Sequence, residues 1–152
     1  MWVAPRPEAH FDRAQPFGHH GGSLTPYKLR HLPSDRFLAV ALEIAETPRQ
    51  RRVGLLGRAG LDEGEGMLFP GTWSIHTFGM AFSIDVAFLD SELGVRALRP
   101  NLAPRRLAGS FLAAYAVELP AGTLARLAVA PGDLLRIEKH VAPVSRGPDE
   151  QP

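Results

Sequence analysis

A succession of short apolar segments separated by short turns constrains the fold of this chain more than any other feature. Seven such segments, rich in Val, Ile, Leu and Phe and bounded by Gly, Pro, Asp or Ser, are typical of strands. They are FLAVALEIA (37–45), MLF (67–69), SIHTF (74–78), IDVAFLD (84–90), GVRALRP (94–100), YAVELP (115–120) and LLRIEK (134–139). Because strands follow strands over short turns, antiparallel pairing is favoured over a parallel sheet. The sequence therefore predicts a mainly β (α+β) fold, a small antiparallel β-sandwich or partly closed barrel with two short helices.

The two helices are predicted from their end signals and periodicity. In residues 47–58, Thr47 is placed to cap the first turn and Gln50 stands at the capping-box position. Gly57 is placed to end this helix. Residues 121–129 repeat apolar side chains on one helical face and predict the second helix.

The domain organisation follows from where these patterns begin and end. Residues 1–36 contain five prolines and no regular period, so we expect an irregular or disordered N-terminal extension. Residues 37–139 form a single β-rich domain, and residues 140–152 form a flexible C-terminal tail. The adjacent His19 and His20 lie in a Gly-rich setting, which favours a solvated loop over a metal site.

Composition excludes several classes of protein. The absence of cysteine excludes disulfides, thiolate metal sites and cysteine nucleophiles. A net charge of +1 gives no global field towards nucleic acid or acidic lipid. No apolar run approaches the roughly 18 residues of a membrane-spanning helix, and no signal peptide is visible. We therefore expect a cytoplasmic protein without a nucleic-acid or membrane partner.

Arginines gather on the first predicted helix and at its end, at Arg49, Arg51, Arg52 and Arg58. They could contact phosphates. Because no aromatic residues are interleaved with them and the net charge is small, nucleic-acid binding is not favoured.

Polar residues interrupt the apolar stretch 74–90, and Asp85 is the most informative of them. It lies between Ile84 and Val86 on a strand that reads as buried. A carboxylate on an inward strand face is costly unless it is paired or hydrogen-bonded. Arg58 or backbone amides of the Gly-rich turn are candidate partners. Asp85 is then either a structural tie between helix and sheet, or a base or metal ligand in a cleft.

His76 also lies on a strand and is either a satisfied core histidine or a ligand facing a groove. With Met80 it offers a soft nitrogen and sulfur pair suited to copper, but two ligands are too few for a site. We therefore expect no metal and no cofactor. With Asp85 and a hydroxyl such as that of Thr77, His76 could resemble a hydrolytic triad, although no nucleophile elbow or oxyanion motif accompanies them.

Five motifs taken in order resemble the family catalogued as domain of unknown function 192. They are TPRQRRVGLLGR, EGEGMLF, SIHTFGMAFSIDVAFLD, NLAP and AVELPAGTLARLAVAPGDLLRI, and they cover about residues 38–138. The resemblance implies a small β-rich fold found widely in bacteria and archaea, often behind a secretion signal, with no established activity. The family positions it carries over are Gly54, Gly57, Arg58, Glu65, Gly66, His76, Met80, Asp85, Leu119, Pro120, Gly122, Gly132 and Asp133. Relatives commonly have a Cys before SIHTF and a Trp where this chain has Arg105, and this chain has neither.

These observations favour a non-enzymatic domain that binds a small molecule or a partner. Its ligand-binding groove would be lined by His76, Thr77, Met80 and Asp85, with Arg58 nearby. One alternative is a hydrolase using His76 as base and Asp85 as its orienting group, which requires the two side chains to lie within hydrogen-bonding distance. The other is a structural protein-interaction domain. The sequence does not indicate an oligomeric state.

Overall fold

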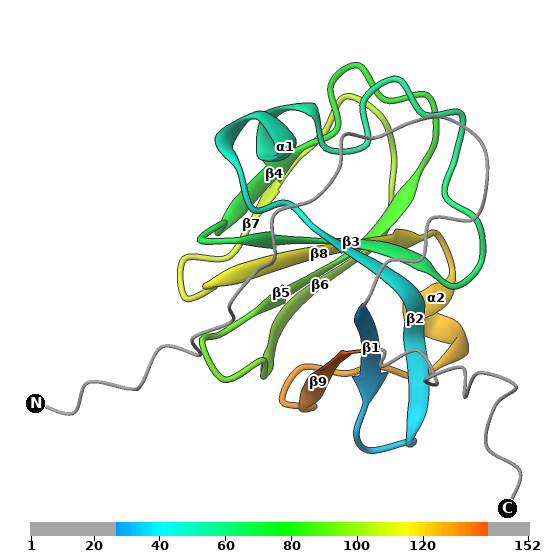
Figure 1. Ribbon diagram of the computed structural model, residues 1–152, viewed down its shortest axis with the longest axis vertical. Helices are drawn as coiled ribbons and strands as arrows, with labels where there is room; N and C mark the ends of the chain where they lie inside the picture. The colour runs from blue at the N-terminus through cyan, green and yellow to red at the C-terminus, as the bar shows by residue number, and fades with distance from the viewer. Residues whose placement is uncertain (1–26, 140–152) are drawn as a thin grey trace, which may run out of the picture.

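The computed structural model describes residues 27–139, and within them the chain forms nine strands and two short helices (Figure 1). In chain order they are β1 (Tyr27–His31), β2 (Arg36–Ile44), α1 (Pro48–Val53), β3 (Glu65–Pro70), β4 (Ser74–His76), β5 (Ile84–Leu89), β6 (Val95–Leu102), β7 (Leu107–Gly109), β8 (Tyr115–Pro120), α2 (Thr123–Arg126) and β9 (Leu135–Lys139). The prediction of a mainly β fold with two short helices is confirmed. The seven predicted strands are present, and β1 and β7 are additional.

Seven strands form one curled sheet in the order β6-β5-β8-β3-β2-β1-β9, while β4 and β7 form a separate two-stranded sheet. The two edges of the large sheet approach each other. Gly94 and Leu134 form an isolated bridge, and the Val95 amide donates to the Asp133 carbonyl at 2.8 Å. The sequence predicted either a sandwich or a partly closed barrel, and the fold is therefore the partly closed barrel.

The pairing of β2 with β3 is parallel, whereas the other pairs are antiparallel. The predicted preference for antiparallel pairing describes the other pairs, and β2 with β3 is the exception. Between Ile44 and Glu65 the chain forms α1 and a long loop, which is enough chain to return to the starting end of the sheet.

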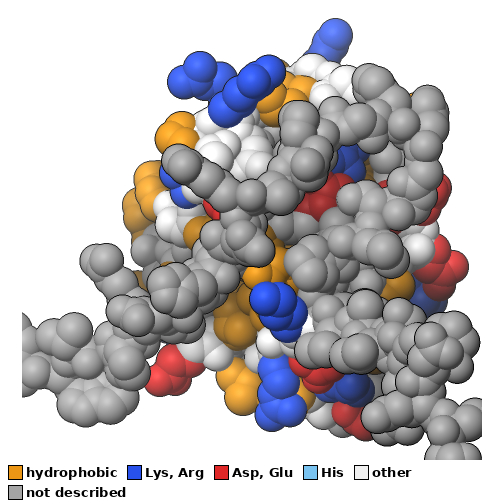
Figure 2. Space-filling model, viewed as in Figure 1, with side chains coloured by type: hydrophobic (Ala, Val, Ile, Leu, Met, Phe, Trp, Pro, Cys, Tyr) orange, Lys and Arg blue, Asp and Glu red, His pale blue; other side chains and the backbone are white. Residues whose placement is uncertain are grey.

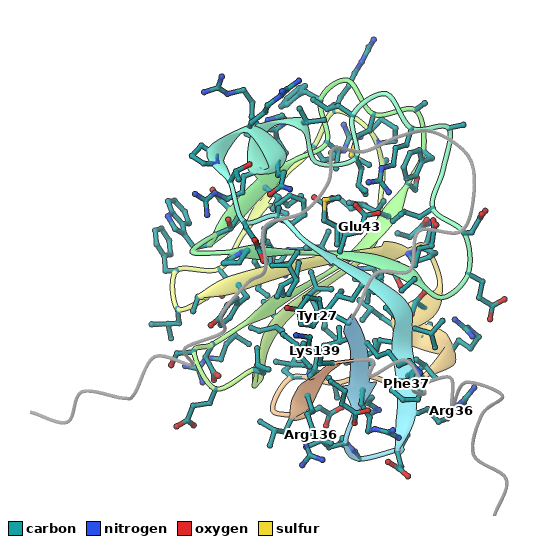
Figure 3. The ribbon with its side chains drawn as sticks, in the orientation of Figure 1. Tyr27, Arg36, Phe37, Glu43, Arg136 and Lys139 are labelled. Atoms are coloured by element: carbon teal, nitrogen blue, oxygen red, sulfur yellow. The ribbon has the colours of Figure 1, made fainter. Side chains whose placement is uncertain are left out.

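The domain begins earlier than the predicted boundary at residue 37. Strand β1 pairs with β2 and, over its whole length, with β9, so that Tyr27 lies opposite Lys139 (Figure 3). Its Leu29 is fully buried. The interpretation of residues 27–36 as irregular is wrong because the prolines of this region lie outside the strand, at positions 26 and 33, and do not interrupt its ladder.

Other terminal predictions fall outside the described residues. These are the irregular character of residues 1–26, the loop carrying His19 and His20, and the tail at 140–152.

Helix α1 begins with the predicted capping box. The Gln50 amide donates to Thr47 Oγ1 at 3.1 Å, and the Thr47 amide donates to Gln50 Oε1 at 2.9 Å. The helix ends at Gly54, where φ is +47°, and not at the predicted Gly57. A Cβ at Gly54 would lie 3.4 Å from the ring of Phe69, so the glycine brings α1 close to β3.

The central strands β5 and β8 are buried on both faces and separate two apolar cores. Their side chains alternate between the barrel interior, where α2 packs, and an outer core beneath α1 and β4. Ala87, Leu89, Val117 and Leu119 point into the barrel interior, and Val86, Phe88 and Ala116 point into the outer core. By this alternation Asp85 belongs to the barrel face and Glu118 to the outer face.

Candidate functional site

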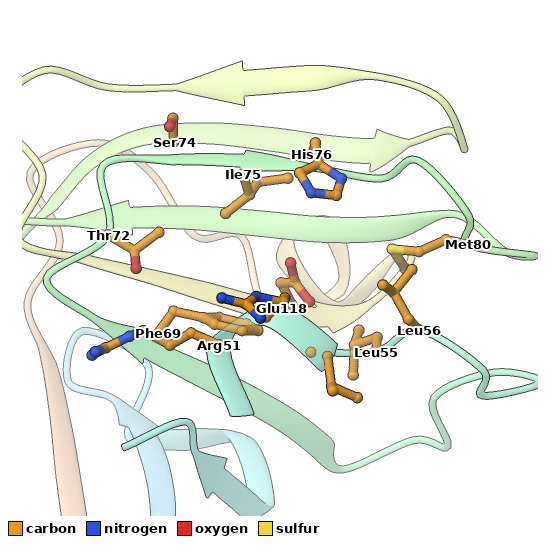
Figure 4. Close-up of a pocket in the computed structure, with 13 residues that line it drawn as sticks. Arg51, Leu55, Leu56, Phe69, Thr72, Ser74, Ile75, His76, Met80 and Glu118 are labelled. Atoms are coloured by element: carbon orange, nitrogen blue, oxygen red, sulfur yellow. The ribbon is translucent and has the colours of Figure 1, made fainter. Parts of the chain in front are cut away.

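A cleft of about 240 Å³ opens between α1 and β4, above the outer face of the large sheet (Figure 4). One wall is α1 with the residues that follow it, and the other is β4 with the turn before it. Strands β3 and β8 contribute the floor. The lining comes from residues 51–56, Phe69, Thr72, residues 74–76, Met80 and Glu118.

Glu118 is the most unusual residue of the cleft. It is only 5% exposed, and among the described residues its carboxyl has no hydrogen-bond or ion-pair partner. Figure 4 shows the carboxyl group in the cleft, on the side of His76. Burial raises the pKa of Glu118 from 4.5 to about 7, against the opposing effect of the positive charge of Arg58. Both protonation states are therefore accessible near neutral pH.

Sequence reasoning missed Glu118, although a signal for it exists. In YAVELP the residue stands between Val117 and Leu119, a carboxylate inside an apolar strand. This is the same pattern that drew attention to Asp85.

Arg58 pairs with Glu43 and does not reach Asp85. Its two terminal nitrogens donate to the two carboxylate oxygens of Glu43, at 3.0 and 2.9 Å. This bidentate pair fastens the segment after α1 to β2. Arg58 does not line the cleft, and its role in ligand binding stays a prediction, but its charge acts on Glu118.

Asp85 is fully buried and both of its carboxylate oxygens are occupied by backbone amides. Oδ1 accepts from the Asn101 amide and Oδ2 from the Leu124 amide, both at 2.8 Å. The carboxylate thereby joins β5 to the end of β6 and to α2. Asp85 therefore ties these elements together, which is the structural one of the two interpretations drawn from the sequence. It does not line the cleft, and its role in ligand binding stays a prediction.

Thr77 is a second structural residue among those predicted to bind a ligand. It is fully buried, its hydroxyl donates to the Ala103 carbonyl at 2.7 Å, and it accepts from the Arg106 amide at 2.9 Å. These bonds hold the chain between β6 and β7 against the end of β4. The Thr77 hydroxyl is therefore used by the fold and does not face the cleft.

His76 and Met80 are the two predicted residues that do line the cleft. His76 is exposed, and its ring centroid lies 5.8 Å from that of Phe78, so it faces a groove and not the core. Met80 is 9% exposed and supplies an apolar wall. The His76 and Asp85 pair of the hydrolase hypothesis is not assembled, because both oxygens of Asp85 are bonded elsewhere.

Within residues 27–139, no group of three or more His, Asp or Glu side chains is placed to hold a metal ion. In the same part of the chain, neither helix is long and apolar enough to cross a membrane.

Comparison with known families identifies the family of this chain. Residues 30–137 match the model of DUF192, described as Uncharacterized ACR, COG1430. The chain belongs to this family. The predicted resemblance is thereby confirmed, and the DUF192 match covers β2 through α2 together with the end of β1 and the start of β9. No curated protein matches the chain.

Two solved structures are similar to this DUF192 chain. A protein of Sinorhizobium meliloti 1021 described as a "putative transcription regulator" is 32% identical, with a TM-score of 0.64 over 72% of this chain and 90% of the other. A protein of unknown function from Novosphingobium aromaticivorans DSM 12444 is 23% identical, with a TM-score of 0.65 over 81% of this chain and 93% of the other. The second likeness shows a shared fold.

Proposed function

We propose that this chain is a small-molecule-binding domain and that its ligand occupies the cleft between α1 and β4. The observation that carries the proposal is the Glu118 carboxyl, buried and without a partner among the described residues. Leaving a buried polar group unsatisfied costs about 1–3 kcal/mol, so such groups are rare and call for a reason. A ligand that hydrogen-bonds to Glu118 would satisfy this carboxyl and so account for its position.

The lining of the cleft supports the same proposal. The cleft combines apolar side chains, those of Leu55, Phe69, Ile75 and Met80, with polar side chains that converge from different elements. Small-molecule sites have this character. The groove predicted around His76, Met80 and Asp85 thus becomes a cleft around His76, Met80 and Glu118.

The walls are held by contacts within the fold that need no ligand, which supports a preformed site. The capping box fixes the start of α1, and Gly54 packs on Phe69. The pair formed by Arg58 and Glu43 anchors the segment that follows. Preformed walls reduce the ordering cost of binding.

The test is a titration followed by amide chemical shifts, using four probes that share one ring: benzoate, benzamide, benzyl alcohol and benzylamine. At least one probe should produce saturable shifts at Gly54, Leu55, His76 and Met80, while resonances around Lys139 on β9 serve as the control. If none of the four perturbs the cleft at millimolar concentration, the proposal is contradicted.

An exposed apolar surface favours a second candidate, a protein-interaction domain. Trp73 and Phe111 stack with ring centroids 5.3 Å apart, and Phe111 and Leu107 are 90% and 75% exposed beside the small β4–β7 sheet. Figure 2 shows hydrophobic side chains along the upper left edge, where Figure 1 places these strands. Exposed patches of this kind mark interaction sites. Self-association in analytical ultracentrifugation that Phe111→Ser abolishes would support this candidate, and a monomer at all concentrations would count against self-association.

A further inference from the structure

The mouth of the cleft is cationic, because Arg51 and Arg52 of α1 line it. In Figure 2, Lys and Arg side chains project at the upper left, where Figure 1 places α1. Neither Arg51 nor Arg52 forms an ion pair with a described residue, and the only hydrogen bond of the Arg51 side chain there is a long one, 3.5 Å to the Pro70 carbonyl.

Some arginines of the described residues are paired with nearby carboxylates. Arg30, Arg58 and Arg126 each pair with a glutamate, at 2.6, 2.9 and 2.6 Å. The segments that build the cleft walls, 47–61 and 66–84, contain no Asp or Glu. The guanidinium groups at the mouth therefore have no carboxylate close to them on the cleft walls, unlike those of Arg30, Arg58 and Arg126.

The interior of the cleft differs in chemical character from its cationic mouth. Phe69, Ile75 and Met80 present apolar surface, and Glu118 is the single carboxyl among the lining residues. In its protonated form Glu118 donates a hydrogen bond to an acceptor on a ligand. A cationic ligand would need the ionised form of Glu118 and would have to pass two arginines, so the charges at the mouth act against it.

The size of the cleft limits the ligand. A volume of about 240 Å³ holds roughly eight groups the size of a water molecule. This is the size of one ring or a short branched chain with a head group.

We infer that the cleft takes a small organic anion, with its anionic group held by Arg51 and Arg52 and its apolar body against Phe69, Ile75 and Met80. Charged hydrogen bonds from guanidinium groups to a carboxylate or phosphate are the strong kind, and they orient the anion. The inference names the ligand class of the proposed binding function and rests on that function.

The experiment compares the dissociation constants of the four ring probes. Benzoate should bind roughly tenfold more tightly than benzamide and benzylamine, with an advantage that shrinks as salt is added. Arg51→Gln combined with Arg52→Gln should reduce benzoate binding to the level of benzamide. Arg99→Gln is the matched control, because Arg99 is an exposed arginine on β6 that does not line the cleft.

The outcomes separate failure of the inference from failure of the binding function. If benzylamine or benzamide binds in the cleft more tightly than benzoate, the ligand class is wrong and the binding function stands. If benzoate binding is unaffected by the Arg51 and Arg52 changes, or weakened equally by Arg99→Gln, the anion is held by general surface charge and the inference is overturned. If no probe shifts the cleft resonances, both the ligand class and the proposed binding function are contradicted. Unchanged melting temperatures of the arginine variants establish that binding, and not folding, has changed.

Discussion

Two buried carboxylates on neighbouring strands of the same sheet have opposite surroundings. Asp85 on β5 and Glu118 on β8 lie one position apart in register, since Asp85 is opposite Leu119 and Val86 is opposite Glu118. Asp85 points to the barrel interior and accepts two backbone amides. Glu118 points to the outer face, where it lines a cleft and has no partner among the described residues.

Burial of a charge therefore does not by itself indicate function. A carboxylate that satisfies two otherwise unpaired amides contributes to stability, because removing it would leave both amides unsatisfied. A carboxyl without a partner is a cost to the fold, and such costs concentrate at binding sites. Asp85 therefore belongs to the architecture and Glu118 to the site.

The largest expected effect is that of Asp85→Ala. The change leaves the amides of Asn101 and Leu124 unsatisfied and removes a charge from two hydrogen bonds, which should lower the free energy of unfolding by about 3–5 kcal/mol. Urea unfolding measures this loss. Glu92→Ala, at an exposed turn residue, is the control and should change stability by less than about 0.5 kcal/mol. A loss at Asp85 as small as that at Glu92 would contradict the structural role of the Asp85 carboxylate.

The next effect is a pH dependence that Glu118 confers and Glu118→Gln removes. Its pKa is raised in the folded protein from 4.5 to about 7, so between these values the folded state holds a proton that the unfolded chain has lost. The free energy of unfolding therefore falls as pH rises from about 4.5 to 7, by an amount on the order of 3 kcal/mol, and is constant above. Unfolding curves of both proteins across this range test it, and parallel pH profiles would contradict it.

A smaller effect is expected at Thr77. Thr77→Val keeps the shape but removes the hydroxyl bonded to Ala103 and Arg106, which should cost about 1–3 kcal/mol. Thermal unfolding measures the change, with Thr72→Val as the control because that hydroxyl makes only a 3.3 Å contact with the Pro70 carbonyl. Equal stabilities of the two variants would show that Thr77 does not hold this loop.

The smallest effect on stability is expected at His76, because it is exposed whereas its neighbour Thr77 is buried. Its exposed ring makes no hydrogen bond within the described residues, so His76→Ala should change the free energy of unfolding by less than about 0.5 kcal/mol. The same variant should weaken probe binding in the cleft. A large loss of stability would instead make His76 part of the architecture.

Much of the fold follows from local signals in the sequence. Alternating apolar segments located seven of the strands, and the capping residues Thr47 and Gln50 located the start of α1. Strand β1 was missed because its five residues carry little pattern of their own and depend on pairing with the adjacent β2 and with β9 at the other end of the domain. The parallel pairing of β2 with β3 likewise depends on the path of the intervening chain.

The site was harder to predict, because alternation shows which face a side chain is on and not what it contacts. The partners of Asp85 are amides 16 and 39 residues away, and no sequence pattern connects them to the carboxylate. Arg58 was expected to pair with Asp85 and pairs instead with Glu43. His76 and Met80 line the cleft, and Glu118 was overlooked although its pattern is that of Asp85.

The most direct test of this account is the titration of the Glu118 side-chain carboxyl, followed by its carbon chemical shift in protein labelled at glutamate. A carboxyl that is buried without a partner should titrate with a pKa of about 7. Glu118→Gln identifies its resonance by removing it. A midpoint near the ordinary value of 4.5 would mean that Glu118 is solvated or hydrogen-bonded within the fold, and the distinction between Asp85 and Glu118 would then be wrong.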